Sequence, residues 1–537
     1  MTNPGNDASP PSHSTARRGL LRAAAGGVLA AATAATVAPR RTSLAQSPLP
    51  ARAQAIMGAP RYSIARWFMY VADRATGEPL YSLNGDDLVL PASTTKLWST
   101  AAALDAYGPD FRFETPIYRR GVVNAAGELE GDLILVASGD LTMGGRNTPQ
   151  GTIAFTSIDH AEANLIPGAM LTPEDPLAGL DELARQVAAS GIRRVRGNVL
   201  IDARLFEQRP KDDYILTPIM INDNLIDLLV VPEAVGQAAT VEWRPQTAAY
   251  TVQSQVRTVA AGGDLDVTAE SPRPGVIVVE GTIPADAGEV LRTVQVADPQ
   301  AFARTLLIEA IERQGVAVDA TPTATNPVAQ LPPSDSYATT DQVARLRSLP
   351  FSENIKLINK VSMNVQADTL IMLLAVKHGE RTFEEGMALM LPFVQKTGID
   401  PDTISLSDGR GNEYSDLFSP HTVTRLLRYM ATRPDFPTYF NSMPIFGVDG
   451  TETIVVPPTS PVAGKAQAKS GTTAAGDLMH QRPILMVRGN AGYLTGKSGR
   501  EMVFGLYVMY VPMMGIEDLF DILKDLGSIV EAIYEIT

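Results

Sequence analysis

Cysteine is absent from this sequence of 537 residues, and histidine is scarce. The absence of cysteine excludes disulfides, thiolate metal ligands, a cysteine nucleophile and a lipid-modified cysteine. The five histidines are scattered, with no His-x-x-x-His pair of a zinc site, and the chain has no Gly-x-Ser-x-Gly nucleophile elbow. We therefore expect structural or surface roles for the histidines, no metal and no cofactor.

Basic residues are also fewer than acidic residues. The chain has 45 lysines and arginines against 59 aspartates and glutamates, which gives a net charge of −14. A surface of this sign argues against nucleic acid as a partner. Hydrophobic residues make up 45% and charged residues 19% of the chain, a balance typical of globular proteins. The length suggests roughly two to four domains.

The first 45 residues have the features of a targeting segment. Two adjacent arginines, Arg17 and Arg18, precede an alanine-rich run at residues 23–38. Residues 43–45, Ser-Leu-Ala, then place small side chains where a signal peptidase cleaves. We predict that residues 1–45 are a cleaved, twin-arginine-like signal peptide and that the protein is exported to the periplasm. A disordered basic tail and a retained membrane anchor are the alternatives.

The chain from residue 60 predicts an α/β (α+β) fold whose first part is a β-hairpin followed by a helix. Two apolar runs at residues 64–71 and 79–83 flank a turn at 74–77, and an apolar helix-forming run begins at Leu97. After residue 350 the pattern is mostly helical, with one buried strand. The expected helices lie at 355–376, 381–398, 421–432 and 517–533, and the strand at 501–510.

Between these two parts lies a long stretch, residues 113–349, that predicts one or two inserted β-rich domains. Short strand-like runs recur in it, separated by glycine, proline and acidic residues, with helices expected at 180–189 and 298–314. We therefore divide the chain into residues 60–112 plus 350–537 as one domain and residues 113–349 as the insertion. The last helix, at 517–533, has an acidic face that opposes anionic lipid, so we expect it to pack on a sheet; a peripheral contact with a membrane is the alternative, which we do not predict.

The segment at residues 91–98 carries the first candidate for chemistry. Ser93 and Lys96 are three positions apart at the start of a helical run, which puts their side chains on one face. A serine hydroxyl is a poor nucleophile until a base takes its proton, and a buried lysine with a lowered pKa can be that base. Because Ser-x-x-Lys also arises by chance, and an N-capping serine next to a surface lysine is the simpler interpretation, the motif needs support from elsewhere.

Two further motifs give that support. Ser362-x-Asn364 stands inside the helical region, and Lys469-Ser470-Gly471 stands near the end of the chain. The order Ser-x-x-Lys, Ser-x-Asn, Lys-[Ser/Thr]-Gly is the signature of penicillin-binding proteins and serine β-lactamases. A second Lys-Ser-Gly, at residues 497–499, predicts a hairpin turn before the strand at 501–510, so we take Lys469 and not Lys497 as the lysine of the third motif. A phosphate-binding loop in the same region is rejected because its first glycine would be Ala491.

These motifs, with Pro444–Thr451, Ala491-Gly492-Tyr493 and the glycine-containing segments at 131–140 and 191–202, resemble one family. It is the D-alanyl-D-alanine carboxypeptidase/endopeptidase family, the class C low-molecular-mass penicillin-binding proteins. The resemblance covers most of residues 60–537. It implies the serine β-lactamase/penicillin-binding transpeptidase-like fold, an antiparallel sheet flanked by helices, with the insertion at 113–349. Peptidoglycan stem peptides are then the expected substrates and β-lactam antibiotics the expected covalent inhibitors.

The resemblance also implies residue roles. Ser93 is the expected nucleophile, Lys96 its base, and Ser362 a catalytic hydroxyl that hydrogen-bonds Lys96 and relays a proton to the leaving amine. Lys469 is expected to keep Lys96 neutral through its charge. The expected substrate-binding residues are Asn364, Lys469, Ser470, Gly471, Thr472 and Thr473, with the backbone N–H groups of Ser93 and Thr472 as the oxyanion hole.

The sequence departs from the family pattern in two places, and two other functions stay open. Ser470 stands where the family usually has threonine, which keeps the hydroxyl, and residues 474–490 predict an inserted loop at one rim of the site. A serine β-lactamase would share the triplets but needs a positioned carboxylate for fast deacylation, and no Glu-x-x-x-Asn loop of that kind is present. A non-catalytic cell-wall scaffold of the same fold is the other alternative, and the intact motif residues argue against it.

Overall fold

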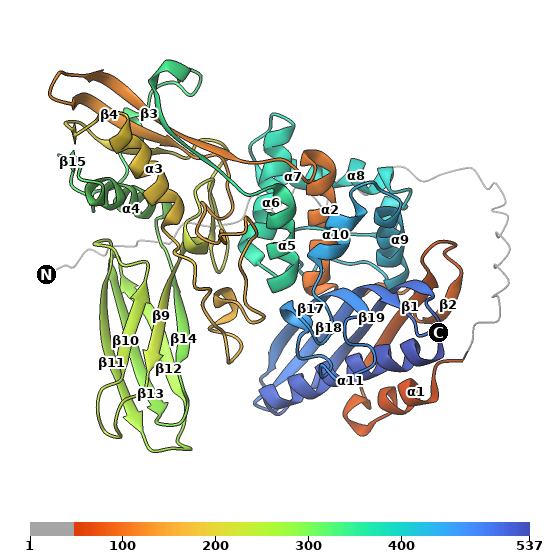
Figure 1. Cartoon of the computed structure of the whole chain (residues 1–537). Helices are drawn as coiled ribbons and strands as arrows, with labels where there is room; N and C mark the ends of the chain where they lie inside the picture. Colours follow the sequence, from red (N-terminus) through yellow and green to blue (C-terminus); the bar gives the residue numbers. More distant parts are fainter. Residues whose placement is uncertain (1–47) are drawn as a thin grey trace, which may run out of the picture. The chain divides into compact units, whose positions relative to one another are not determined.

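The structure is a computed structural model that describes residues 48–537 (Figure 1). The signal peptide predicted at residues 1–45 lies outside the described residues. Among the described helices, none combines the length and the apolar character needed to cross a membrane.

Five antiparallel strands from the two ends of the described chain form one sheet, in the order β17-β18-β19-β1-β2. The strands are β1 (Arg66–Asp73), β2 (Pro79–Leu83), β17 (Ala466–Asp477), β18 (Arg482–Thr495) and β19 (Glu501–Pro512). The predicted hairpin is confirmed because β1 pairs with β2. The strand predicted at 501–510 is confirmed as β19, which lies beside β1 in the middle of the sheet.

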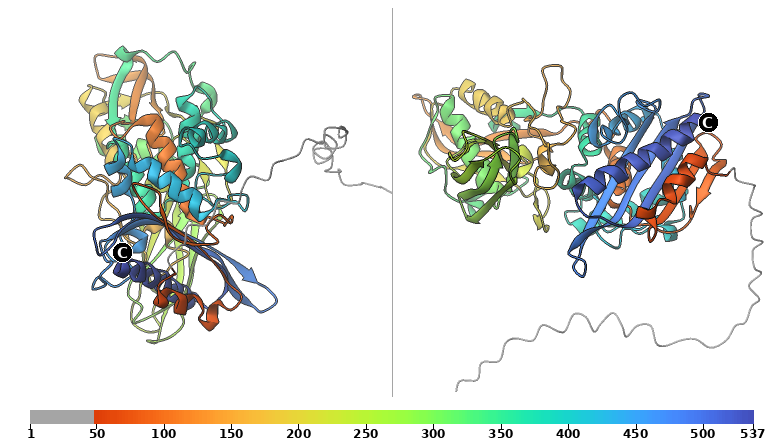
Figure 2. Two further views of the ribbon diagram at one scale, coloured as in Figure 1. Left: turned by 90° about the vertical axis from the view of Figure 1, so that its right-hand side faces the viewer. Right: turned by 90° about the horizontal axis from the view of Figure 1, so that it is seen from below.

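Helices cover both faces of this sheet (Figure 2). On one face, α11 (Ile516–Ile536) and α1 (Ala51–Met57) pack against the strands in one apolar cluster. On the other face, α2 (Lys96–Tyr107) and α9 (Pro420–Ala431) pack in a second cluster around the fully buried Trp98. The last helix therefore packs on the sheet, as its amphipathic pattern predicts.

The helical region after residue 350 is more broken than the sequence suggests. Its helices are α5 (Phe351–Val361), α6 (Asn364–Lys377), α7 (Phe383–Ala388), α8 (Met390–Lys396), α9 and α10 (Phe436–Ser442). The helical region predicted at 355–376 is confirmed, but it is two helices rather than one, because Ser362 ends α5 with φ 63° and ψ 35°. A non-glycine residue seldom adopts this left-handed conformation, and no periodicity of apolar residues reports it.

The chain enters and leaves the stretch between α2 and α5 on neighbouring strands. β3 (Glu114–Val123) pairs with β16 (Gln342–Arg347) in a six-stranded sheet. The other strands of that sheet are β4 (Glu128–Val136), β5 (Arg194–Val195), β6 (Val199–Asp202) and β15 (Ala317–Val318). This pairing allows a long segment to leave and return at one place. The division of the chain into a domain and an insertion stays a prediction.

Two three-stranded sheets and two helices complete this stretch. One sheet has the order β10 (Thr240–Arg244), β9 (Leu225–Val231), β14 (Val290–Gln295), and the other β11 (Thr251–Val259), β13 (Val276–Pro284), β12 (Asp266–Arg273). A short hairpin joins β7 (Arg209–Pro210) and β8 (Ile215–Leu216). The predicted helices are α3 (Ala178–Ala189) and α4 (Pro299–Arg313), and the Asp298 side chain caps α4. A single apolar cluster joins the two three-stranded sheets and the two helices, whereas Leu216 of β8 belongs to the cluster around Trp98.

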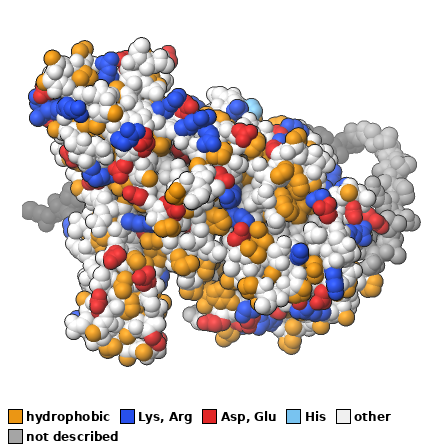
Figure 3. All heavy atoms as spheres, in the orientation of Figure 1, with side chains coloured by type: hydrophobic (Ala, Val, Ile, Leu, Met, Phe, Trp, Pro, Cys, Tyr) orange, Lys and Arg blue, Asp and Glu red, His pale blue; other side chains and the backbone are white. Residues whose placement is uncertain are grey.

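The loop predicted at residues 474–490 is wrong, because this segment continues the sheet as a hairpin. β17 and β18 stay paired from Ala474 opposite Leu485 to Asp477 opposite Arg482. The alanine, glycine and aspartate residues of this stretch have low strand propensity, but a ladder with a neighbouring strand overrides such preferences. Leu478 and Met479 at the turn are among the most exposed apolar side chains of the described chain. On the face shown in Figure 3, acidic and basic side chains are interspersed.

Candidate active site

Ser93 lies on a 3₁₀ turn, η2 (Ala92–Thr95), that leads directly into α2 at Lys96. The strand that carries the third motif, β17, lies against this turn. A Cβ at Gly471 would come 2.3 Å from the Pro91 carbonyl oxygen and 3.0 Å from the Ser93 nitrogen. Glycine is therefore required at position 471, because only a bare backbone allows this approach. The first and third motifs are in contact for this reason.

Lys96 joins the first motif to the second. Its side chain is fully buried, and its Nζ donates hydrogen bonds to Ser93 Oγ at 2.8 Å and to Asn364 Oδ1 at 2.7 Å. A third bond, of 3.1 Å, goes to the Arg410 carbonyl oxygen. The amine is thus held at hydrogen-bond distance from the serine hydroxyl, which is the geometry required of a base for that hydroxyl.

Lys469 joins the third motif to the second. Its Nζ, also fully buried, donates to Ser362 Oγ at 2.9 Å and to the Ser470 carbonyl oxygen at 2.7 Å. The expected hydrogen bond between Ser362 and Lys96 is wrong in the described chain, since Ser362 Oγ accepts from Lys469 and Lys96 bonds Asn364 instead. The physical reason is the left-handed turn at Ser362, which separates this serine from the start of α6, where Asn364 lies.

Burial sets the electrostatics of both amines. Burial lowers the pKa of Lys96 to about 8, although the charges of Asp408, Glu162 and Asp368 act to raise it. Burial, and after it the charge of Lys96, holds the pKa of Lys469 well below its usual value. The expectation that the charge of Lys469 is what keeps Lys96 neutral therefore needs correction, because desolvation is the leading cause.

A cavity of about 390 Å³ opens onto these groups. The predicted site residues on its wall are Ser93, Ser362, Asn364, Ser470, Thr472 and Thr473. The two lysines lie buried behind this wall, bonded to Ser93 and Ser362. All of the residues named from the three motifs therefore meet at one place, although Lys96 and Lys469 are far apart in the sequence.

The cavity wall also contains charged residues that the motifs do not include. Arg488 donates to Thr472 Oγ1 at 2.9 Å and to the buried Glu452 carboxylate at 3.1 Å. Arg410 donates to Asp213 Oδ1 at 2.7 Å. Arg488 could have been found from the sequence if β17 and β18 had been extended, because it lies directly opposite Thr472.

Glu162 is the other charged residue on the wall that sequence analysis missed. It lies in the 3₁₀ helix η3 (His160–Glu162), on a long connection between β4 and α3. No motif or periodicity marks this connection, so only the tertiary structure reveals that it reaches the cavity.

Three comparisons with known proteins show what the whole chain resembles. A family model described as the D-Ala-D-Ala carboxypeptidase 3 (S13) family matches residues 50–516. A D-alanyl-D-alanine carboxypeptidase of an Actinomadura species is 28% identical over 461 residues, which are 81% of this chain and 76% of that protein. The D-alanyl-D-alanine carboxypeptidase DacB of Haemophilus influenzae is 22% identical over 443 residues, covering 79% of this chain and 81% of the relative.

The same fold is found in a solved structure. The crystal structure of penicillin binding protein 4 (dacB) from Haemophilus influenzae, complexed with a novel β-lactam, matches with a TM-score of 0.63 at 20% identity. The match covers 90% of this chain and 99% of that one. It confirms the fold class predicted from the sequence.

Proposed function

The chain belongs to the D-Ala-D-Ala carboxypeptidase 3 (S13) family, and on that premise we propose that it hydrolyses D-Ala-D-X bonds of peptidoglycan stem peptides through a Ser93 acyl-enzyme. The protein is a D-Ala-D-Ala carboxypeptidase, as its relatives are named. We further propose that the reaction passes through a covalent intermediate and that the enzyme also cleaves peptide cross-links as an endopeptidase. β-Lactams should acylate the same serine, and residues 1–45 should direct export. The observation that carries the proposal is the 2.8 Å hydrogen bond between Lys96 Nζ and Ser93 Oγ at the wall of the cavity.

In the acylation step, Ser93 Oγ attacks the substrate carbonyl carbon while Lys96 takes its proton. The neutral form of Lys96 is accessible near neutral pH because burial lowers its pKa to about 8. The proposed oxyanion hole is the pair of backbone N–H groups of Ser93 and Thr472, and each such donor is worth about 3–4 kcal/mol in other serine enzymes. The strand β17 supports this role, because its glycine at position 471 lies against the Ser93 backbone.

Lys96 passes the proton taken from Ser93 directly to the leaving amine, because no hydrogen bond within residues 48–537 joins it to Ser362, and Ser362 is the proposed hydrogen-bonding partner of that amine. Its Oγ faces the cavity and is oriented by Lys469 at 2.9 Å. Asn364 restrains Lys96 at 2.7 Å and is the proposed partner of the substrate's amide. The hydroxyls of Thr472 and Thr473 and the guanidinium of Arg488 lie on the wall where we propose that the terminal carboxylate binds.

The direct test is release of D-alanine from a synthetic stem pentapeptide by the chain without residues 1–45. Wild-type protein should release one D-alanine per peptide, and Ser93→Ala should release none while keeping its thermal unfolding transition. Ser470→Thr is the matched control, because it restores the family's usual residue and should keep activity. Activity that survives in Ser93→Ala would contradict the proposal.

A further inference from the structure

The connection between β4 and α3 places an acidic side chain in the catalytic cavity. Glu162, at the end of η3, lies on the same cavity wall as Ser93, Ser362 and Asn364. The same connection contributes apolar residues to that wall, among them Ile158, Ile166 and Met170. One side of the cavity is therefore built by a segment that is remote in sequence from all three motifs.

We propose that the Glu162 carboxylate is the general base that activates water for hydrolysis of the Ser93 acyl-enzyme. This inference rests on the proposed function, because it assigns a residue to the second half of the same reaction.

Glu162 has no structural partner that would explain its place. Within residues 48–537, no side-chain hydrogen bond or ion pair involves its carboxylate, and the half-buried side chain lies on the cavity wall. The partners left for this carboxylate are molecules inside the cavity, and water, the reactant that hydrolysis needs, is a hydrogen-bond donor of the right kind. A role in binding or catalysis therefore explains the position of Glu162 better than a role in stabilising the fold.

The charges around Glu162 suit a base. Burial raises its pKa, the charges of Lys96 and Lys469 act to lower it, and those of Asp159 and Asp213 act to raise it further. Glu162 in turn acts to raise the pKa of Lys96, so the two groups lie within electrostatic reach of one another. A carboxylate whose pKa is raised is a stronger base than a solvated one.

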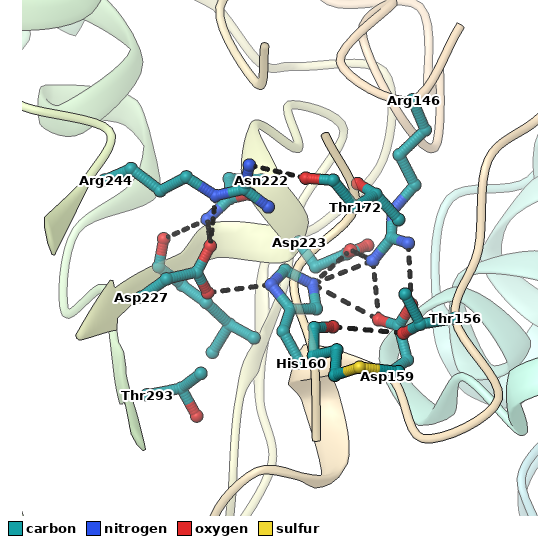
Figure 4. Close-up of polar contacts among 12 residues, drawn as sticks. Arg146, Thr156, Asp159, His160, Thr172, Asn222, Asp223, Asp227, Arg244 and Thr293 are labelled. Atoms are coloured by element: carbon teal, nitrogen blue, oxygen red, sulfur yellow. Dashed lines mark hydrogen bonds and ion pairs between the residues drawn. The ribbon is translucent and has the colours of Figure 1, made fainter. Parts of the chain in front are cut away.

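A buried ion network fixes the helical turn that carries Glu162 (Figure 4). Arg146 bonds Asp159 at 2.7 Å, and His160 bonds Asp227 at 2.7 Å and Asp223 at 3.0 Å. These three bonds are made by the two residues before Ala161 and Glu162, so they anchor the N-terminal end of η3.

The same network reaches the second motif. Gln366, two residues after Asn364 on α6, donates to Asp223 Oδ1 at 2.7 Å. The turn that carries Glu162 and the helix that carries Asn364 are therefore tied to one carboxylate. Positioning of this kind is what a general base needs, since its oxygen must meet a water at hydrogen-bond distance.

The chemical step balances without any further reactant. A water oxygen forms a bond to the acyl carbon of the Ser93 ester while one water proton passes to Glu162. The tetrahedral intermediate then collapses, the bond from carbon to Ser93 Oγ breaks, and Oγ regains the proton from Glu162 through the Lys96 amine that is bonded to it. The product is the shortened peptide acid, with Ser93 and Glu162 restored.

The experiment measures acylation and deacylation separately. Binding of a fluorescent penicillin gives the acylation rate constant, and the loss of label during a chase with unlabelled penicillin gives the deacylation rate constant. Glu162→Gln should slow the loss of label by about 10²-fold or more, while the acylation rate constant, measured above pH 8 where Lys96 is mostly neutral, should stay unchanged. Asp212→Asn, an exposed neighbouring carboxylate that is not on the cavity wall, is the matched control and should change neither rate. Equal loss of both rates in Glu162→Gln, or no change in deacylation, would overturn the inference.

A measurement on the wild-type protein covers the case in which the variant does not fold. Deacylation should fall as the pH is lowered and Glu162 is protonated, with a slower rate in D₂O than in water. A deacylation rate that is flat on the acid side contradicts a carboxylate base. Absence of any adduct on wild-type protein would overturn the proposed function and this inference together, whereas a normal adduct with unchanged deacylation in Glu162→Gln overturns the inference alone.

Discussion

The Nζ of Lys469 lies 2.9 Å from the Oγ of Ser362, so the third motif supports the second directly. Lys96 makes the other connection, to Ser93 and Asn364. The site therefore consists of two serine–lysine pairs on one cavity rather than one chain of contacts from Ser93 to Ser362. Each pair has its own lysine, and burial lowers the pKa of both amines.

The first prediction concerns Lys96 and pH. Because the neutral amine is the base and its pKa is about 8, acylation by a penicillin should speed up as the pH rises toward 8 and level off above it. Lys96→Ala should lower the acylation rate constant by about 10²- to 10⁴-fold and remove this dependence. Stopped-flow acylation measured across the neutral and mildly alkaline range checks both statements. A wild-type profile without a rise below pH 8 would rule out Lys96 as the base.

The second prediction uses two glycines of one strand. Gly471→Ala adds a Cβ 2.3 Å from the Pro91 carbonyl oxygen and must push β17 away from Ser93, so acylation should fall on the order of 10²-fold. Gly476→Ala is the control, since its Cβ would meet its nearest neighbour at 3.7 Å. The penicillin acylation rate of both variants is the measurement. Equal rates would show that the contact between β17 and the turn does not matter.

The third prediction concerns the stability of the buried network. Asp223→Ala removes the carboxylate shared by Arg146, His160 and Gln366, which leaves buried charge uncompensated. The free energy of unfolding should drop by about 3–5 kcal/mol. Glu182→Ala, which breaks an exposed ion pair on α3, should change it little. Urea unfolding followed by circular dichroism compares the two, and similar losses would contradict the account.

The fourth prediction is the pH dependence that His160 gives to stability. Burial alone would lower its pKa, but the charge of Asp227 and the hydrogen bonds to Asp223 and Asp227 raise the pKa to about 10, from a usual value of 6.5. The folded state thus holds the proton more tightly than the unfolded state. The resulting stabilisation is complete below pH 6.5 and is lost as the pH rises through about 10.

His160→Gln should remove that part of the pH dependence. The difference in unfolding free energy between wild type and this variant should therefore shrink from pH 6.5 to 10. His480→Gln, at the exposed turn of the β17–β18 hairpin, serves as the control. A constant difference for His160→Gln would mean that this histidine is not held charged by its carboxylates.

Short-range patterns explain what the sequence could predict. Ser93 and Lys96 are three positions apart on one helical turn, so their contact follows from local geometry. The hairpin of β1 and β2 and the amphipathic α11 follow from periodicity in the same way.

The rest depends on tertiary structure. The break at Ser362 is a single left-handed residue, and it decides that Ser362 meets Lys469 rather than Lys96. The hairpin at 474–490 is stabilised by its neighbouring strand against the local propensity. Glu162 reaches the cavity because a buried ion network folds its connection there, and no local pattern encodes such long-range pairing.

The most direct test of the central claim is the mass of the peptide that carries a penicillin adduct. The chain without residues 1–45 is incubated with penicillin, digested and analysed by tandem mass spectrometry, beside Ser93→Ala and Ser362→Ala. The account predicts one adduct per chain, on Ser93, that is lost in Ser93→Ala and still forms, more slowly, in Ser362→Ala. An adduct on another residue, or none on the folded wild-type protein, would contradict it.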